Sequence, residues 1–154
     1  LNIGPKPDGS VPRQAIERLT AVGRWMDVYG KACVYGPRPR AKGLLDVGNM
    51  LDWTRGRDPK TIYAWCRTWP KGGVVGMGWF KGKVKRVRLL TPDGAKPVKF
   101  VQDGRRVTIT GLPKACPDKS VGIAVLQMDC DRKPGRWMSV HPATEDLNWK
   151  WFDE

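Results

Sequence analysis

A helical pattern of apolar residues lies near the start of the chain. Apolar side chains recur there at intervals of three and four, at Ile16, Leu19, Val22, Met26 and Tyr29. This spacing predicts an amphipathic helix over residues 12–29. Pro12 suits the first helical position, and Gly30 is placed to end the helix. The sequence therefore predicts one helix with a single apolar face.

A different pattern follows residue 50. Short β-rich runs are separated by turns that contain Asp-Gly or Pro, and these runs are TIYAWCRTW, KVKRVRLL, PVKFVQ, RRVTIT and VGIAVLQM. Strands at this density, without helices between them, predict an antiparallel β-sandwich or barrel. In VGIAVLQM both alternating sets of positions are nearly apolar, so this strand is expected at the centre of its sheet. The predicted fold class is mainly β, an antiparallel β-sandwich preceded by one amphipathic helix.

Composition divides the chain into four parts. Residues 1–36 contain the helix, and residues 37–50 are rich in Pro, Gly and positive charge, which is typical of a linker. Residues 51–130 carry the β pattern, and residues 131–154 form a tail of uncertain structure. The tail contains Trp137, Trp149 and Trp151, which are costly to leave together in water. We expect the tail to pack on the sandwich or on a partner.

The chain is strongly basic. It has 28 Lys and Arg against 15 Asp and Glu, for a formal net charge of +13. This charge raises the alternative of a weak polyanion-binding domain. The basic residues are spread along the sequence without a helix-turn-helix, RNA-recognition or zinc-finger signature, so no specific nucleic acid partner is expected. Binding through scattered charges would be weak and lost as salt rises.

The cysteines give little support to a metal site. They lie far apart without a C-x-x-C pair, and the single histidine is His141; the cysteines are Cys33, Cys66, Cys116 and Cys130. No metal and no cofactor is therefore expected. Two disulfides are possible in a secreted protein, although the apolar strand pattern around Cys66 favours a buried free thiol. No apolar run approaches the length of a membrane span, and no membrane partner is expected.

The first forty residues carry a more specific signal. The stretch LNIGPKPDGSVPRQAIERLTAVGRWMDVYGKACVYGPRP resembles the segment by which the alpha-L-fucosidases, glycoside hydrolase family 29, leave their catalytic barrel. The shared features are an L-N-[IV]-G-P-x-x-D-G turn, a helix ending in G-x-W-x-x-x-x-G and a Tyr-Gly pair. The β-rich runs are similar to that family's C-terminal β-sandwich, so the resemblance covers about residues 1–128.

The resemblance implies that the catalytic groups lie outside this chain. It makes residues 1–3 the tail of the last barrel strand, residues 12–29 the last barrel helix and the rest an accessory domain. Family members are retaining enzymes that use a nucleophilic aspartate and a second carboxylate. No position here matches the motifs of those two residues, so the chain alone is expected to be inactive. Asn2, Lys6 and Asp8 are at most a pocket rim in the parent, and a structural turn is the favoured interpretation.

One group of residues points to sugar contact. Tyr63, Trp65, Arg67 and Trp69 share one parity of a predicted strand, and aromatic faces beside a cation are how sugar-binding sandwiches hold pyranose rings. The other parity is also apolar, so packing is favoured over sugar binding. A carbohydrate-binding module remains the alternative.

These patterns together predict a structural role. We expect a non-catalytic accessory sandwich that stabilises the catalytic barrel of the parent or its oligomer, with a fucosylated glycan reached only through the parent. Family resemblance implies a secreted, periplasmic or lysosome-like compartment. In the isolated chain the apolar face of the helix is expected to fold back on the sandwich, in preference to pairing with a second copy.

Overall fold

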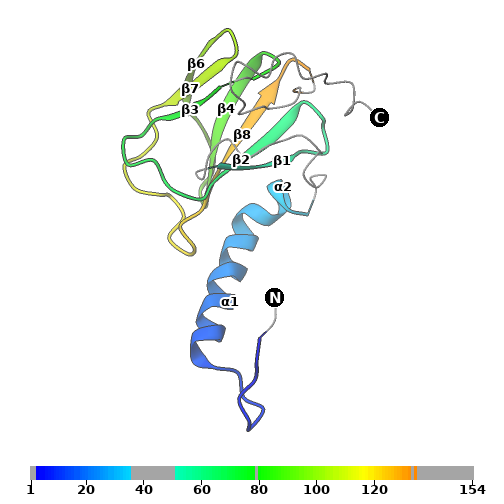
Figure 1. Cartoon of the computed structure of the whole chain (residues 1–154), viewed down its shortest axis with the longest axis vertical. Coiled ribbons are helices and arrows are strands. Elements are labelled where there is room, and N and C mark those ends of the chain that lie inside the picture. Colours follow the sequence, from blue (N-terminus) through cyan, green and yellow to red (C-terminus); the bar gives the residue numbers. More distant parts are fainter. Residues whose placement is uncertain (1–2, 36–50, 79, 133, 135–154) are drawn as a thin grey trace, which may run out of the picture.

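The structure is a computed structural model, and it describes residues 3–35, 51–78, 80–132 and 134. Figure 1 shows a two-layered β body from which one long helix projects. The helical elements are α1 (Arg13–Trp25), η1 (Met26–Gly30) and α2 (Lys31–Cys33). The strands are β1 (Leu51–Arg55), β2 (Thr61–Cys66), β3 (Val75–Met77), β4 (Val84–Thr91), β5 (Gly94–Pro97), β6 (Lys99–Asp103), β7 (Arg106–Thr110) and β8 (Ala124–Cys130).

Two antiparallel sheets form the sandwich, which confirms the predicted fold class. The larger sheet has the strand order β1-β2-β8-β4-β5 and the smaller has the order β3-β7-β6. Strand β8 is central in the larger sheet, as its apolar residues on both faces predicted. Two hairpins lie at the predicted turns: residues 91 and 94 pair across the β4–β5 turn, and residues 103 and 106 pair across the β6–β7 turn.

The core lies between the two sheets. Alternate side chains of β2, β4 and β8 point inward from the larger sheet, and they meet inward residues of β3 and β7. Ile62, Leu126, Met128, Val107 and Ile109 are fully buried there. Burying such a side chain contributes roughly 1.5–3 kcal/mol each, so this layer holds the sandwich together.

The helix is longer than predicted. The expectation that Gly30 ends it is wrong, because Gly30 has helical angles (φ −57°, ψ −43°) and the chain continues helically to Cys33. A Cβ at Gly30 would lie 2.9 Å from Cε2 of Tyr35, whose side chain is 69% exposed and has room to move. The turn before it, η1, is a π-helical turn.

Only the C-terminal end of this helix packs on the sandwich. Trp25, Tyr29 and Cys33 are buried on the outer face of the larger sheet, against Tyr63, Leu90 and Val125. The indole Nε1 of Trp25 donates a hydrogen bond of 2.7 Å to the carbonyl of Ile123. The rings of Trp25 and Trp65 lie 5.1 Å apart. These contacts fix the direction in which the helix leaves the sheet.

The described residues leave the rest of the apolar face of the helix partly exposed. Ile16, Leu19 and Val22, which we call the exposed stripe, are 52%, 36% and 40% exposed. The expected fold-back is therefore wrong for these three residues. The physical reason is that α1, η1 and α2 follow one another as a continuous helix. Because its last turns pack on the sheet, they fix the direction of the whole helix, and its N-terminal part projects away from the sheets (Figure 1).

Candidate functional site

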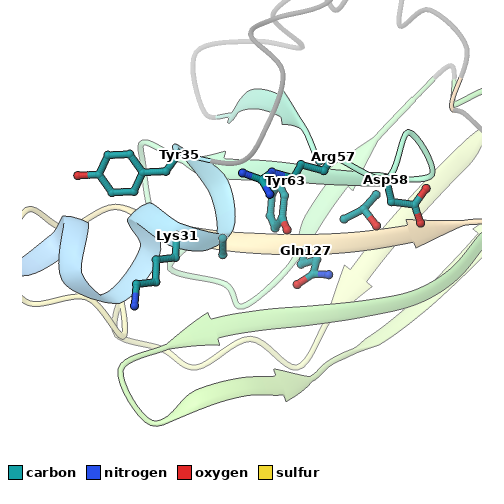
Figure 2. Close-up of a pocket in the computed structure, with 9 residues that line it drawn as sticks. Lys31, Tyr35, Arg57, Asp58, Tyr63 and Gln127 are labelled. Carbon is teal, nitrogen blue, oxygen red and sulfur yellow. The ribbon is translucent and has the colours of Figure 1, made fainter.

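A depression opens on the outer face of the larger sheet, beside the end of the helix (Figure 2). It has a volume of about 420 Å³, within the range of about 300–1,000 Å³ typical of ligand pockets. Three segments line it: the end of the helix, the β1–β2 turn and the neighbouring strands β2 and β8. The lining residues are Lys31, Ala32, Tyr35, Gly56, Arg57, Asp58, Thr61, Tyr63 and Gln127.

Tyr63 and Gln127 form the floor of the depression. They are direct partners in the β2–β8 register. In Figure 2 the hydroxyl of Tyr63 points towards Gln127. Burial, with the neighbouring Cys33 and Asp129, raises the pKa of Tyr63. The phenol therefore stays protonated at neutral pH and offers a hydrogen-bond donor to the depression.

Next to this floor, two arginines converge on one carboxylate. Arg86 NH2 and Arg88 NH2 lie 2.8 Å and 3.0 Å from Oδ2 of Asp129. Its Oδ1 accepts hydrogen bonds from Thr61 Oγ1 at 3.1 Å and from Gln127 Nε2 at 3.2 Å. The carboxylate thus orients Gln127 and Thr61 at the edge of the depression. Burial alone raises the pKa of Asp129, but these hydrogen bonds and the charge of Arg88 outweigh it and leave the pKa lowered.

Replacing Asp129 with asparagine is expected to cost stability in a pH-dependent way. The folded-state pKa lies below the ordinary 3.8, so the contribution of Asp129 is present above the unfolded value and is lost as pH falls through the folded value. Asp129→Asn should lower the free energy of unfolding by about 1–2 kcal/mol at neutral pH. Urea unfolding of both proteins between about pH 2 and pH 7 checks this. A difference that stays constant across that range would contradict it.

The structure separates the four residues predicted for sugar contact. Tyr63 lines the depression, but Trp65 lies under the helix and donates from Nε1 to Thr54 Oγ1 at 3.0 Å. Arg67 pairs with Asp52 at 3.0 Å. The shared parity fails at Trp69 because β2 ends at Cys66, and the Trp69 ring packs instead against the cluster between the sheets. Only Tyr63 is thus brought to the depression.

Two of the three predicted pocket-rim residues, Lys6 and Asp8, lie in the N-terminal turn. Asn2 is outside the described residues. The carboxylate of Asp8 accepts from the backbone N–H of Ser10 at 2.9 Å and from its hydroxyl at 2.7 Å. These hydrogen bonds lower the pKa of Asp8. The Lys6 carbonyl accepts from Gly9 N at 2.9 Å. The turn has its own internal bonds, and the rim role in a parent protein stays a prediction.

Sequence reasoning missed several residues around the depression. Lys31, Arg57 and Gln127 come from a helix end, a turn and a strand that are far apart in the chain. No periodicity connects such positions. One signal was available for Asp129, which is a carboxylate inside a strand that is apolar on both faces.

The four cysteines are free thiols in the structure. Cys66 is a free thiol with no exposed surface, which confirms its interpretation as a buried free thiol, and burial raises its pKa to about 12. Within the described ranges there is no cluster of three His, Cys, Asp or Glu that would hold a metal ion. His141 and the tail tryptophans lie outside those ranges. Among the described helices, none has the length and apolar character needed to cross a membrane.

Known proteins resemble both the helical and the β part. A family model described as Alpha-L-fucosidase matches residues 1–31. The tissue alpha-L-fucosidase of Rattus norvegicus is 36% identical over 118 residues, which covers 76% of this chain and 24% of the rat protein. The solved alpha-fucosidase of Thermotoga maritima superposes with a TM-score of 0.62 at 27% identity, over 84% of this chain and 29% of that structure. The chain is related to the alpha-L-fucosidases.

The fucosidase resemblance covers most of this chain but a minor part of its relatives. The tissue alpha-L-fucosidase of Mus musculus is 29% identical over 76% of this chain and 25% of the mouse protein. A family 29 alpha-L-fucosidase from Bacteroides thetaiotaomicron matches with a TM-score of 0.64 at 25% identity, over 85% of this chain and 28% of that structure. The chain therefore corresponds to a partial region, about a quarter of the length of the fucosidases that it matches.

Proposed function

We propose that this chain is the non-catalytic accessory part of an alpha-L-fucosidase-like glycoside hydrolase. In this role the sandwich stabilises a catalytic barrel or its oligomer, and the barrel supplies the site for a fucosylated glycan. The observation that carries the proposal is the exposed stripe, formed by Ile16, Leu19 and Val22 on a helix held rigidly by the sandwich. The family model covers this same segment, residues 1–31.

The free energy gained by covering the exposed stripe favours binding of a partner protein. Full burial of such a side chain is worth roughly 1.5–3 kcal/mol, and between 36% and 52% of each of these three is still exposed, so covering them on α1 is worth about half of that each. The sandwich covers Trp25 and Tyr29 further along the same helix but leaves these three uncovered. A protein surface placed over α1 would therefore gain binding energy without any rearrangement of the sandwich.

The described carboxylates support a non-catalytic role. A retaining glycosidase needs two carboxyl groups about 5–5.5 Å apart that face one pocket. Here Asp58 accepts from the backbone of Lys60, Asp118 accepts from backbone N–H groups of its own loop, and Asp129 pairs with two arginines. Each of these groups holds local structure.

The isolated chain is expected to hydrolyse no aryl α-L-fucoside. The reason is that Asp58, Asp118 and Asp129 hold local structure, and the described concavities have at most one carboxylate each in their described linings. The release of 4-nitrophenol from its α-L-fucoside at pH 5 and pH 7 measures this, with a family 29 enzyme as the positive control. Turnover that survives repurification, and that is abolished by replacing one carboxylate of this chain, would overturn the proposal.

The stripe has its own test. Leu19→Asp with Val22→Asp is expected to change the free energy of unfolding by no more than about 0.5 kcal/mol, because both side chains are exposed. Sedimentation velocity at rising concentration should show self-association of the wild-type chain through the uncovered stripe, which the double variant removes. Gln14→Asp with Arg18→Asp, on polar positions of α1, is the control. A double variant that unfolds would show that the stripe packs within the chain.

A second candidate function is saccharide contact at the depression. It is favoured by Tyr63, whose hydroxyl faces the depression, and by Gln127, whose amide oxygen is left to accept while its nitrogen donates to Asp129. Tyr63→Phe should then abolish any saturation-transfer signal from added fucose or galactose without changing the unfolding midpoint. The covering of Trp65 by the helix makes this candidate the weaker one.

A further inference from the structure

Two cations lie at the edge of the depression shown in Figure 2. Lys31 comes from the end of the helix, Arg57 comes from the β1–β2 turn, and both residues are exposed. Neither side chain has an ion-pair or hydrogen-bond partner within the described ranges. The carboxylate of the described lining is Asp58, and its Oδ1 accepts from Lys60 N at 2.9 Å. The described lining therefore carries two positive charges and one negative charge.

The charged residues next to the floor do not cancel this excess. Asp129 accepts from Gln127 Nε2 at 3.2 Å, and Arg86 and Arg88 lie 2.8 Å and 3.0 Å from its Oδ2. Arg88 is also the register partner of Gln127, so this group adds a further positive charge beside the floor. A concave surface with an excess of one charge sign attracts ligands of the opposite sign. The depression therefore favours an anionic ligand.

The floor offers a hydroxyl and an amide oxygen that the described residues leave unpaired. Tyr63 is only 8% exposed, yet its hydroxyl has no hydrogen-bond partner in the described part of the chain. Buried polar groups are nearly always paired, so this hydroxyl points to a group from outside the chain. The amide nitrogen of Gln127 donates to Asp129, which leaves its oxygen to accept. A donor and an acceptor thus lie side by side, because Tyr63 and Gln127 are register partners.

A carboxylated sugar combines the groups that these residues would bind. The planar fork of an arginine matches a carboxylate with two parallel hydrogen bonds, and a lysine adds a second charged donor. A sugar hydroxyl both donates and accepts, which matches the Tyr63 hydroxyl and the Gln127 oxygen. The volume of about 420 Å³ has room for one sugar ring. Asp58 would repel a group of higher charge, such as a phosphate monoester, and would accept from a sugar hydroxyl instead.

We propose that this depression binds a carboxylated monosaccharide unit, with Arg57 and Lys31 on its carboxylate and with Tyr63 and Gln127 on its hydroxyls. The inference rests on the second candidate function, saccharide contact at the depression, and adds the class of sugar. It does not depend on the accessory role of the chain.

Pairs of sugars that differ only in the carboxylate test its recognition. The methyl glycosides of galacturonic acid and galactose form one pair, and those of glucuronic acid and glucose form the other. Binding to the full chain is measured by chemical-shift titration in NMR at about 0.05 M salt, where screening is modest. In at least one pair the acid should bind at least about tenfold more tightly than its neutral counterpart, because hydrogen bonds to charged groups contribute more than neutral ones.

Two matched double variants locate the site. The test variant is Lys31→Gln with Arg57→Gln, and the control is Lys60→Gln with Lys71→Gln. All four residues are exposed, and both variants lose two positive charges. In the test variant the preference for the acid should fall to about threefold or less, whereas the control should keep a preference of at least about tenfold. Tyr63→Phe should weaken the acid and the neutral sugar to a similar extent, and thermal unfolding of each variant checks the fold.

The opposite results separate this inference from the function on which it rests. Equal binding of the acid and the neutral sugar in both pairs would overturn the assignment to a carboxylated sugar and leave the second candidate function standing. No binding of any of the four sugars would overturn both. Equal losses in the test and control variants would replace the site with diffuse attraction by the charged surface. The 6-sulfate of methyl galactoside is the last comparison, and binding as tight as that of the galacturonide would overturn the assignment to a carboxylate.

Discussion

Replacing Trp25 with alanine is expected to lower the free energy of unfolding by about 3–5 kcal/mol. The indole is 5% exposed, lies 5.0 Å from the ring of Tyr29 and 5.1 Å from that of Trp65, and donates to the Ile123 carbonyl. The Cys33 carbonyl accepts a second hydrogen bond between helix and sandwich, of 3.3 Å, from Thr54 Oγ1, but Trp25 supplies a large buried ring as well as a hydrogen bond. Its loss should release the helix from the sandwich.

Urea unfolding followed by circular dichroism measures this change. Trp25→Phe is the control, since it keeps a phenyl ring in the cluster while it removes the hydrogen bond to Ile123 and the remainder of the indole, for an expected cost of about 1–3 kcal/mol. Hydrogen exchange of the α1 amides should rise in the alanine variant more than in the phenylalanine variant. An unchanged unfolding midpoint for Trp25→Ala would mean that the helix is not docked as the structure shows.

Asp118→Ala is expected to cost about 2–4 kcal/mol, because it removes the acceptor that organises a whole loop. The Asp118 carboxylate is 5% exposed and accepts from the backbone N–H groups of Ser120, Val121, Gly122 and Ile123, at 3.2, 2.9, 2.8 and 3.3 Å. Without it the four donors, which belong to half-buried and exposed residues, lose their shared acceptor, and the loop loses all four of these bonds at once.

The control for Asp118 is another turn aspartate. Asp58→Ala removes a carboxylate that accepts from Lys60 N at 2.9 Å in an exposed turn, where water replaces the bond, so the expected cost is below about 1 kcal/mol. Because the Asp118 loop also presents the Ile123 carbonyl to Trp25, the double variant of Trp25 and Asp118 should cost less than the sum of the single costs. If the losses in unfolding free energy of the two single variants sum to that of the double variant, the Asp118 loop and the Trp25 contact are independent of each other.

The parts of the fold that follow local periodicity were predictable. The helical spacing of residues 16–29 and the apolar strand pattern of β8 both correspond to observed elements, and Asp-Gly turns marked two hairpins. Strands β1, β3 and β5 were not predicted, since LDWTR carries two charged residues among five, VGM is very short and GAKP is exposed along its whole length. Short pairing of this kind depends on a neighbouring strand that the local sequence does not reveal.

The environment of each face was harder to predict. Periodicity identified the apolar side of the helix. It did not show which of these apolar residues the sheet covers, because that depends on how far the helix extends beyond the sheet. Gly30 was taken as a stop signal, whereas the helix continues through it with ordinary helical angles. The depression is assembled from separate segments, so no run of sequence contains it.

The π-helical turn η1 determines the orientation of one end of the helix relative to the other. In a regular α-helix each residue advances by about 100° around the axis, and a π turn adds a residue to the local repeat. The number of residues in Met26–Gly30 therefore sets the rotation of α1 about the helix axis relative to α2. A one-residue deletion there would turn Leu19 by about a quarter of a revolution relative to the sandwich, leaving its exposure unchanged while pointing it away from any partner shaped to receive it.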